Sequence, residues 1–396
     1  MKSPIPLAQD FIIVAESYDR ENAFWGSPGI AQHSSGRIIA TGEYFVRVSD
    51  AKETPATDNL KNQAYVFTSD DQGMTWVERS QLNAWWATPF FVEDTLYYIG
   101  VEPNSYNMTI YASEDGGESW GEPAKLFSGY FHTAPTAMVH LDGHVYKAWE
   151  WSAHQMIGRQ IASVVSIGDA DSDLTKPESW RLTNRVHYPG DLPMMNFRLY
   201  NPTSAPPWNH MTGWLEGNMV NVRGELKVFL RVWPHGPTNV AAMCSLYEKN
   251  GDNKLEFDWY CTFPGGVCKF YIQYDGESDL FWMTSNQPTD HLQDISALWK
   301  RGFVGVPANE RRILNLYYSL DSLNWFQAGT VAMSADPLES FSYPSFIIDR
   351  EDMLVLCRTS VGGKNQHDTN LITFHRVHNF RDFALDLHPR ANAAAR

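Results

Sequence analysis

The sequence predicts an all-β protein, a single β-propeller of four-stranded blades, with six blades favoured and seven as the alternative. Three observations predict this fold. One unit of consecutive strands and turns recurs along the chain, apolar residues alternate within its strands, and no stretch keeps a helical period beyond two turns. The composition is also suitable, because 15 Trp, 18 Tyr and 21 Phe beside 27 Gly and 22 Pro favour short strands joined by tight turns.

Each unit opens with small residues, Pro or Gly, continues through two apolar strands, and ends with a third strand. The clearest units finish in a polar turn with a Trp. The six copies start at Ser27, Ala87, Thr133, Gly213, Gly265 and Ser342. We expect the strand Phe11–Val14 to join the last blade and close the ring, which removes exposed sheet edges. Insertions at about 181–212 and 287–310 would form loops over a central pocket or hide a seventh blade. No linker or charge run divides the chain, so residues 1–396 are expected to form one domain.

Charge, apolar runs and cysteine content limit the partners and the cellular location that can be expected for this protein. Lys and Arg total 31 against 46 Asp and Glu, and the net charge of −15 argues against nucleic acid and anionic membranes as partners. No apolar run is long enough for a transmembrane helix, and the N-terminus lacks a signal-peptide pattern. For the chain as given, the expected location is therefore the cytoplasm. The alternative is a secreted or periplasmic protein whose signal peptide has been removed. Four cysteines leave buried thiols, one disulfide or a partial metal site open.

Two turns carry a specific motif, S-x-D-x-G-x-[ST]-W. It occurs at Ser69 to Trp76 and at Ser113 to Trp120, and Ser319 to Trp325 is a degenerate copy. The Asp is expected to bind backbone N–H groups of its own turn, the Gly to take a positive φ, and the Trp to pack between blades. These turns resemble the Asp boxes of the sialidase-like propellers, and the resemblance covers nearly the whole chain. Asp boxes lie away from the pocket, so they argue for the fold and not for a chemistry.

Pocket residues are expected where the innermost strands converge, at the start of each unit. The substrate-binding candidates chosen on this basis are Trp86, Trp214, Glu216, Asn218, Lys269, Arg358, Asn365 and His367. Further residues at the same strand starts include Trp25, Ser27, Thr88, Thr133, Tyr343 and Ser345. This set of aromatic, hydrogen-bonding and cationic groups suits a polar, anionic sugar.

Four segments resemble the propeller polysaccharide lyases, which include ulvan lyases and rhamnose–glucuronate-cleaving enzymes. They are residues 130–151, 213–220, 263–275 and 365–377. The resemblance implies β-elimination at a uronic acid, with His132 as the base, Arg231 on the carboxylate and Tyr271, or next Tyr274, as the acid. The expected partner is a uronate-containing or other anionic oligo- or polysaccharide. Some relatives carry zinc-binding His residues at the places of Val267 and Tyr271, and since this chain has neither, no metal or cofactor is expected.

Two alternatives remain open. The first is a glycoside hydrolase, in which Glu216 acts as a catalytic carboxylate with Glu150 or Asp368 instead of bracing Arg231. A sialidase also needs three convergent arginines, a Tyr activated by a Glu, and an Asp acid. Its first arginine is missing here, where the chain reads Trp25-Gly26-Ser27-Pro28-Gly29. The second alternative is a propeller that binds carbohydrate without catalysis.

Overall fold

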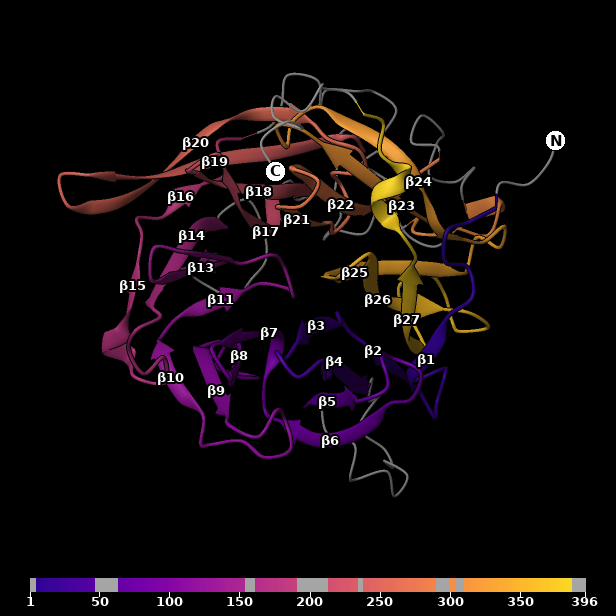
Figure 1. The fold of residues 1–396 in the computed structure, drawn as a ribbon, viewed down its shortest axis with the longest axis horizontal. Coiled ribbons are helices and arrows are strands. Elements are labelled where there is room, and N and C mark those ends of the chain that lie inside the picture. The colour runs from indigo at the N-terminus through magenta and orange to yellow at the C-terminus, as the bar shows by residue number, and fades with distance from the viewer. Residues whose placement is uncertain are drawn as a thin grey trace.

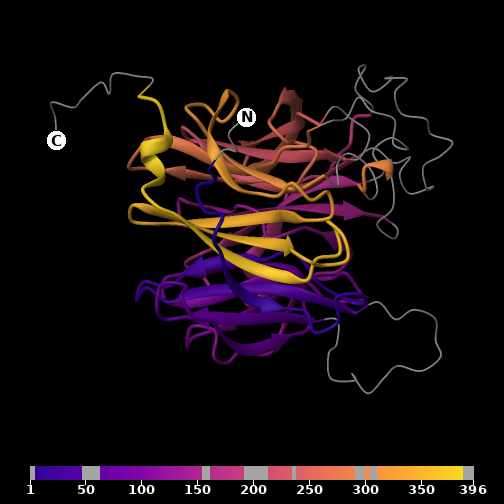
Figure 2. The same ribbon diagram turned by 90° about the vertical axis from the view of Figure 1, so that its right-hand side faces the viewer.

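Six antiparallel sheets are arranged as blades around a central axis in the computed structural model (Figure 1). The structure describes residues 5–46, 63–153, 161–190, 213–233, 238–289, 299–303 and 310–386. Seen from the side, the ring is a disc whose strands run across its thickness (Figure 2). The prediction of an all-β, six-bladed propeller is confirmed.

The blades follow one another in chain order. Blade 1 contains β2 (Ala23–Trp25), β3 (Gly29–Gln32), β4 (Ile38–Val46), β5 (Gln63–Ser69) and β6 (Val77–Leu82). Blade 2 contains β7 (Trp85–Val92), β8 (Thr95–Val101), β9 (Met108–Ser113) and β10 (Ala124–Phe127). Blade 3 contains β11 (Tyr130–His132), β12 (Val139–Leu141), β13 (His144–Ser152), β14 (Ala162–Asp169), β15 (Trp180–Leu182) and β16 (Val186–His187).

The second half of the ring is built in the same way. Blade 4 contains β17 (Gly213–Val222), β18 (Glu225–Trp233), β19 (Val240–Lys249) and β20 (Asp252–Thr262). Blade 5 contains β21 (Tyr271–Asp275), β22 (Leu280–Asn286), β23 (Ile313–Ser319) and β24 (Trp325–Met333). Blade 6 contains β25 (Ser340–Asp349), β26 (Asp352–Ser360), β27 (Leu371–Val377) and the N-terminal β1 (Ile12–Glu16). Two short 3-10 helices are η1 (Pro177–Ser179) and η6 (Phe380–Phe383), and no helix in the described part is long and apolar enough to span a membrane.

The N-terminal strand closes the ring. β1 pairs antiparallel with β27, with Ile12 opposite Phe374 and Glu16 opposite Leu371. The expected closing strand is therefore present, beginning at Ile12 rather than Phe11. Most of the two expected insertions, residues 191–212, 290–298 and 304–309, lies outside the described residues.

The core is divided among the interfaces between blades. The described residues contain six clusters of buried apolar side chains, and each cluster joins two neighbouring sheets. Between blades 3 and 4, for example, Trp214 is fully buried against Tyr188 and Phe257. Since each sheet is covered on both faces by its neighbours, its strands are apolar on both faces.

The two S-x-D-x-G-x-[ST]-W turns make matching hydrogen bonds. In the first turn, Asp71 Oδ1 accepts from Ser69 Oγ (2.8 Å) and from the Thr75 backbone N–H (2.9 Å). In the second turn, Asp115 Oδ1 accepts from Ser113 Oγ (2.8 Å) and from the Ser119 backbone N–H (2.9 Å). The Trp of the first turn, Trp76, packs on Phe374 of the neighbouring blade 6. These turns therefore fix both the strand ends and the blade interface.

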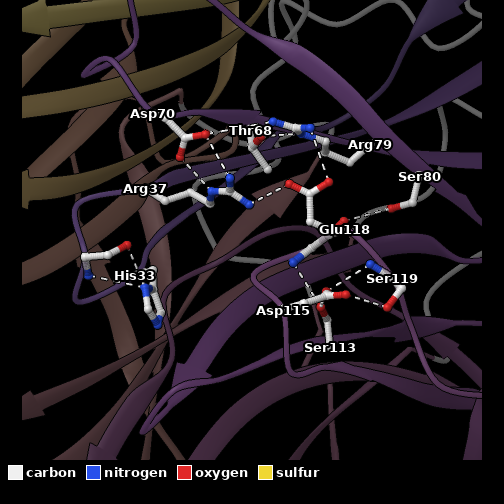
Figure 3. Close-up of polar contacts among 12 residues, drawn as sticks. His33, Arg37, Thr68, Asp70, Arg79, Ser80, Ser113, Asp115, Glu118 and Ser119 are labelled. Carbon is white, nitrogen blue, oxygen red and sulfur yellow. Dashed lines mark hydrogen bonds and ion pairs between the residues drawn. The ribbon is translucent and has the colours of Figure 1, made fainter.

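An ion-pair network joins blades 1 and 2 beside these turns (Figure 3). Arg37 lies between Asp70 (Nε to Oδ1, 2.6 Å) and Glu118 (Nη1 to Oε1, 2.8 Å). Arg79 reaches the other oxygen of Glu118 at 3.2 Å. Because the carboxylates are substantially exposed, the network orients the turns more than it stabilises the fold.

We expect acid to weaken the closure of the ring through His375 of β27. This imidazole is fully buried, with Nδ1 2.8 Å from the Ala8 carbonyl and Nε2 2.9 Å from Thr373 Oγ1. Burial, which outweighs the bond to Ala8, lowers the pKa of His375 to about 4. The unfolded chain then takes up this proton first, so stability should fall by about 3 kcal/mol as the pH drops from roughly 6.5 to 4.

Urea unfolding at pH 7 and pH 4.5 measures this loss. His375→Gln cannot titrate, so its stability should change less with pH than that of the wild type. His187→Gln, at an exposed position, serves as the matched control and should keep the wild-type slope. An unchanged slope in His375→Gln would show that another group causes the acid sensitivity.

Candidate functional site

Three β-bulges in alternate blades turn side chains toward the axis. Trp86 in β7, Glu216 in β17 and Tyr343 in β25 have positive φ angles of 52°, 56° and 50°. The strand register shifts at each of these places, between Trp85 and Thr88, between Leu215 and Asn218, and between Ser342 and Ser345. Positive φ is strained for such residues, at a cost of about 1–3 kcal/mol each, and strain of this kind is concentrated at functional sites.

The bulged residues line a cavity of about 420 Å³ at this end of the ring. Its walls come from blades 1, 2, 3, 4 and 6. The lining residues are Phe24, Gly26, Ser27, Phe45, Val46, Trp85, Trp86, His132, Thr133, Glu216, Tyr343, Arg358, His367 and Asp368. Of the candidates from the sequence, Trp86, His132, Glu216, Arg358 and His367 are thus brought together.

Arg231 connects Glu216 to Tyr343. Its Nη1 lies 2.7 Å from Glu216 Oε2 and 3.3 Å from Tyr343 Oη, and Arg231 is only 2% exposed. Burial by itself would raise the pKa of Glu216, but the nearby charge of Arg231, with His132 and Arg311, holds that pKa below its usual value. Arg231 was expected to bind a substrate carboxylate, and the structure instead pairs it with Glu216, since an unpaired buried guanidinium is costly.

Two further arginines flank the Tyr343 ring. The guanidinium carbon of Arg311 is 5.0 Å from the ring centroid and that of Arg358 is 5.2 Å from it. Arg358 Nε donates to Thr369 Oγ1 at 3.2 Å, and its Nη2 donates to the His367 carbonyl. Arg358 is 8% exposed, lines the cavity, and forms no direct ion pair in the described part of the chain, although the charges of Asp368 and Glu43 act on it from further away. Burial lowers the pKa of Arg358, because its positive charge is poorly solvated there.

His132 reaches the cavity from blade 3 with a carboxylate behind it. Its Nδ1 lies 2.8 Å from Glu150 Oε2, and its ring contacts Trp86 edge-on at 4.4 Å between centroids. Glu150 is fully buried, which raises its pKa despite the bond to His132, and its other oxygen accepts from the Gly217 N–H at 3.3 Å. A Cβ at position 217 would lie 2.9 Å from Ala148 Cβ, so glycine permits the close packing that follows the Glu216 bulge.

A second imidazole, His367, faces the cavity from the loop after β26. His367 Nδ1 lies 3.0 Å from Asp368 Oδ1, and Asn365 Nδ2 donates to Asp368 Oδ2 at 3.2 Å. Desolvation, which outweighs the bond to Asp368, and the charges of Arg358 and Arg311 lower the pKa of His367 to about 4. His367 is therefore neutral at pH 7, and Asn365 supports this loop rather than lining the cavity.

Four other candidates hold the blades together instead of lining the cavity. Trp214 is buried between blades 3 and 4, as described above, so no face is left for a sugar. Asn218 is fully buried and joins blade 4 to both of its neighbours, accepting from Ala137 N before β12 and from Ile272 N of β21 and donating to the Phe270 carbonyl.

The other two come from blade 5. Lys269 is 2% exposed and donates to the Pro344 carbonyl, and burial lowers its pKa to about 7. Tyr271 packs on Phe346 at 5.1 Å, and burial raises its pKa to about 12. Tyr271, the expected acid, is therefore not among the residues that line the cavity with His132, and its raised pKa makes it poorly suited to release a proton. Tyr274, the next choice, is 46% exposed and bonds to Asp279.

The cysteines form no disulfide. Cys244, Cys261, Cys268 and Cys357 are free and buried, which agrees with buried thiols. The part of the chain that the structure describes contains no group of three His, Cys, Asp or Glu side chains arranged to hold a metal ion.

Comparison with solved structures shows which proteins share this architecture. An α-L-arabinanase of Penicillium chrysogenum, solved with arabinobiose, matches with a TM-score of 0.55 and 12% identity over 94% of this chain and 99% of its own. A Trypanosoma rangeli sialidase matches with a TM-score of 0.60 and 13% identity over 96% of this chain and 60% of its own. A Hadza microbial sialidase matches with a TM-score of 0.59 and 15% identity over 93% of this chain and 68% of its own.

The chain has the sialidase-like propeller fold. At these identities the likeness establishes the fold alone. No protein-family model matches the sequence, and no curated protein matches it.

Sequence reasoning missed the lining residues Phe24, Phe45, Val46 and Trp85, and also Arg311, and it gave no role to Tyr343. Tyr343 was recognised only as a residue at a strand start, since nothing local marks a Tyr that three arginines surround. Arg311 precedes β23 beside Arg312 and carries no motif. The only available signal was a sequence Ser-Tyr-Pro at the start of the last unit, similar to the Thr-Pro and Ala-Pro starts of earlier units.

Proposed function

We propose that this chain is a glycoside hydrolase that releases a carboxylate-bearing sugar from the end of a glycan. The observation that carries the proposal is Arg358, a buried cation on the cavity wall that forms no direct ion pair among the described residues. A substrate carboxylate would supply that partner, in the bidentate geometry for which guanidinium is suited. Arg311, on the same Tyr343 ring, would add a second positive charge to this side of the cavity.

Tyr343 is the proposed nucleophile. Its Oη and the Glu216 carboxylate both contact Arg231 Nη1, and we assign to Glu216, held ionised by Arg231, the role of taking the phenol proton. Tyr343 Oη would then form a bond to the anomeric carbon as the bond from that carbon to the leaving oxygen breaks. Arg311 and Arg358 lie beside the Tyr343 ring, and Arg231 Nη1 contacts its Oη, so the attacking oxygen is surrounded by positive charge.

His132 is the proposed proton donor to the leaving oxygen. It faces the cavity with Glu150 behind it, an arrangement that orients an imidazole for acid–base catalysis. In the second step His132 takes a proton from water, which attacks the anomeric carbon and displaces Tyr343 Oη. Glu216 returns its proton to Tyr343, so the enzyme is regenerated and the sugar retains its anomeric configuration.

A polysaccharide lyase is the second candidate, and His132 is the observation that favours it. Paired with Glu150 through Nδ1, a neutral His132 can present the lone pair of Nε2 to the cavity. Such a base could remove the C5 proton of a uronate whose carboxylate is bound by Arg358. Both reactions need a sugar that carries a carboxylate, but they break different bonds and give different products.

A panel of substrates separates these reactions. We expect the protein to release 4-methylumbelliferone from the glycoside of N-acetylneuraminic or glucuronic acid and not from the arabinofuranoside. Ulvan and glucuronan are incubated in parallel, with new reducing ends and the ultraviolet absorbance of a C4=C5 double bond both recorded. Absorbance rising with reducing ends would establish the lyase instead. Release of arabinose alone would overturn the acidic-substrate assignment, and binding without any product would indicate a non-catalytic propeller.

A further inference from the structure

A row of aromatic rings leads outward from the cavity between blades 2 and 3. Trp85 and Trp86, on the cavity wall, both contact Tyr106, with centroid distances of 6.1 Å and 6.0 Å. The rings of Trp86 and Tyr106 are nearly parallel, with an interplanar angle of 20°. Tyr106 in turn contacts Tyr130 at 6.2 Å. The row Trp86, Tyr106, Tyr130 thus starts inside the cavity and continues beyond its lining.

The rings in this row are only partly buried. Trp86, Tyr106 and Tyr130 each keep an intermediate fraction of their surface exposed. No residue in the described ranges hydrogen-bonds to the Tyr106 or Tyr130 hydroxyl. A completely buried tyrosine usually satisfies its hydroxyl within the protein, so these two hydroxyls, with the exposed part of each ring, are left for solvent or a ligand.

Tyr106 is held rigidly in a strained conformation. Its φ is +58°, a region that bulky side chains rarely adopt. The Tyr106 N–H donates to the Glu102 carbonyl (2.9 Å), and the Tyr106 carbonyl accepts from the Phe131 N–H (3.0 Å). The adjacent Asn107 Oδ1 accepts from the Gly129 N–H at 3.1 Å, which also ties the loop to the start of blade 3. The loop therefore presents the ring in a fixed position, which lowers the entropic cost of binding.

The direction of the row identifies the part of the substrate that would reach it. Arg358, which binds the carboxylate in the proposed function, and Tyr343, which attacks the anomeric carbon, belong to blade 6, whereas His132, the proposed donor to the leaving oxygen, belongs to blade 3. Trp86 contacts His132 directly, so the row begins where the leaving group departs. Sugar rings stack their C–H faces on aromatic rings and use their hydroxyls for hydrogen bonds, and both kinds of contact are available here.

We propose that Trp86, Tyr106 and Tyr130 form a binding site for the leaving-group sugars, so that the protein selects an acidic sugar within an oligosaccharide over the same sugar alone. This inference rests on the proposed function for its orientation. It predicts that Tyr106, which lies outside the cavity lining, affects only substrates that extend past the cleaved bond.

Calorimetry with Tyr343→Phe protein, in which turnover is blocked, tests the site. The probes are methyl α-sialoside against 3′-sialyllactose, and methyl β-glucuronide against a hyaluronan tetrasaccharide with a glucuronate end. For at least one pair the longer probe should bind more tightly. Tyr106→Ala should then weaken the longer probe roughly 3- to 10-fold and leave the shorter one unchanged. Tyr106→Phe should stay within about 2-fold, since it keeps the ring.

Trp259→Ala removes a 52%-exposed aromatic ring on β20 and is the matched control, expected to bind both probes normally. If no longer probe binds more tightly than its shorter partner, or if Tyr106→Ala weakens both equally, the proposal is wrong. The proposed function is tested separately by turnover of the wild type. Selective binding without hydrolysis would overturn the proposed function and leave this binding site standing.

Discussion

Tyr343→Phe is expected to lower kcat on an acidic glycoside by a factor on the order of 10³ or more while leaving substrate binding nearly unchanged. The substitution removes only Oη, which is the proposed nucleophile and the atom 3.3 Å from Arg231 Nη1. The ring remains, so Arg311 and Arg358 keep the aromatic surface they pack against at 5.0 Å and 5.2 Å. Steady-state kinetics should therefore show a loss in kcat with little change in KM.

A mechanism-based probe gives an independent readout. A 2,3-difluorinated sialic acid, incubated with the wild type, should add its mass to the peptide that contains Tyr343. Tyr274→Phe changes an exposed tyrosine on β21 and should retain full activity and labelling. Retention of more than a tenth of wild-type activity in Tyr343→Phe would exclude Tyr343 as the nucleophile, as would labelling at Glu216.

The fold could be predicted because its determinants are local. Alternating apolar residues mark strands wherever they occur, and the Ser69 and Ser113 turns mark where third strands end. Ring closure could also be predicted, since an additional apolar strand at the N-terminus can complete the last blade by pairing with β27. The number of blades followed from the number of repeated units.

The candidate site could be predicted only in part because the bulges break the alternation on which the prediction depends. In a regular strand, residues two apart share a face, so Trp214, Glu216 and Asn218 would all point the same way. The register shift between Leu215 and Asn218 separates them: Glu216 lines the cavity, and the other two lie in the interfaces between blades.

Burial and pairing are the other properties that the sequence does not reveal. Lys269 and Arg358 are both cations near inner strand ends, yet Lys269 is bound to the Pro344 carbonyl while Arg358 faces the cavity. Arg231 finds Glu216 across the β17–β18 pair, and Arg311 reaches Tyr343 from a different blade. Such contacts depend on how the blades are placed around the axis. The spacing of residues along one sequence does not predict which side chains of different blades meet.

Arg358 and Arg231 should respond to the same substitution in opposite ways. Both are buried arginines beside Tyr343, but Arg231 has a carboxylate partner and Arg358 has none among the described residues. Arg231→Met would leave Glu216 charged and unpaired in the interior, and we expect a loss of about 3–5 kcal/mol in the free energy of unfolding. Arg358→Met replaces a poorly solvated cation by an apolar side chain, so stability should be unchanged or higher.

Activity measurements should show whether Arg358 serves substrate binding or the stability of the fold. If Arg358 binds the substrate carboxylate, Arg358→Met should lower kcat/KM for an acidic glycoside about 10²-fold, mainly through KM, in a protein whose Tm is not reduced. Arg358→Lys should recover part of the loss, because it restores the charge without the bidentate fork. Thermal unfolding and kinetics on the same preparations decide the matter. A fall in Tm for Arg358→Met equal to that for Arg231→Met would mean that Arg358 serves the fold, and that the cavity is not built around an anionic substrate.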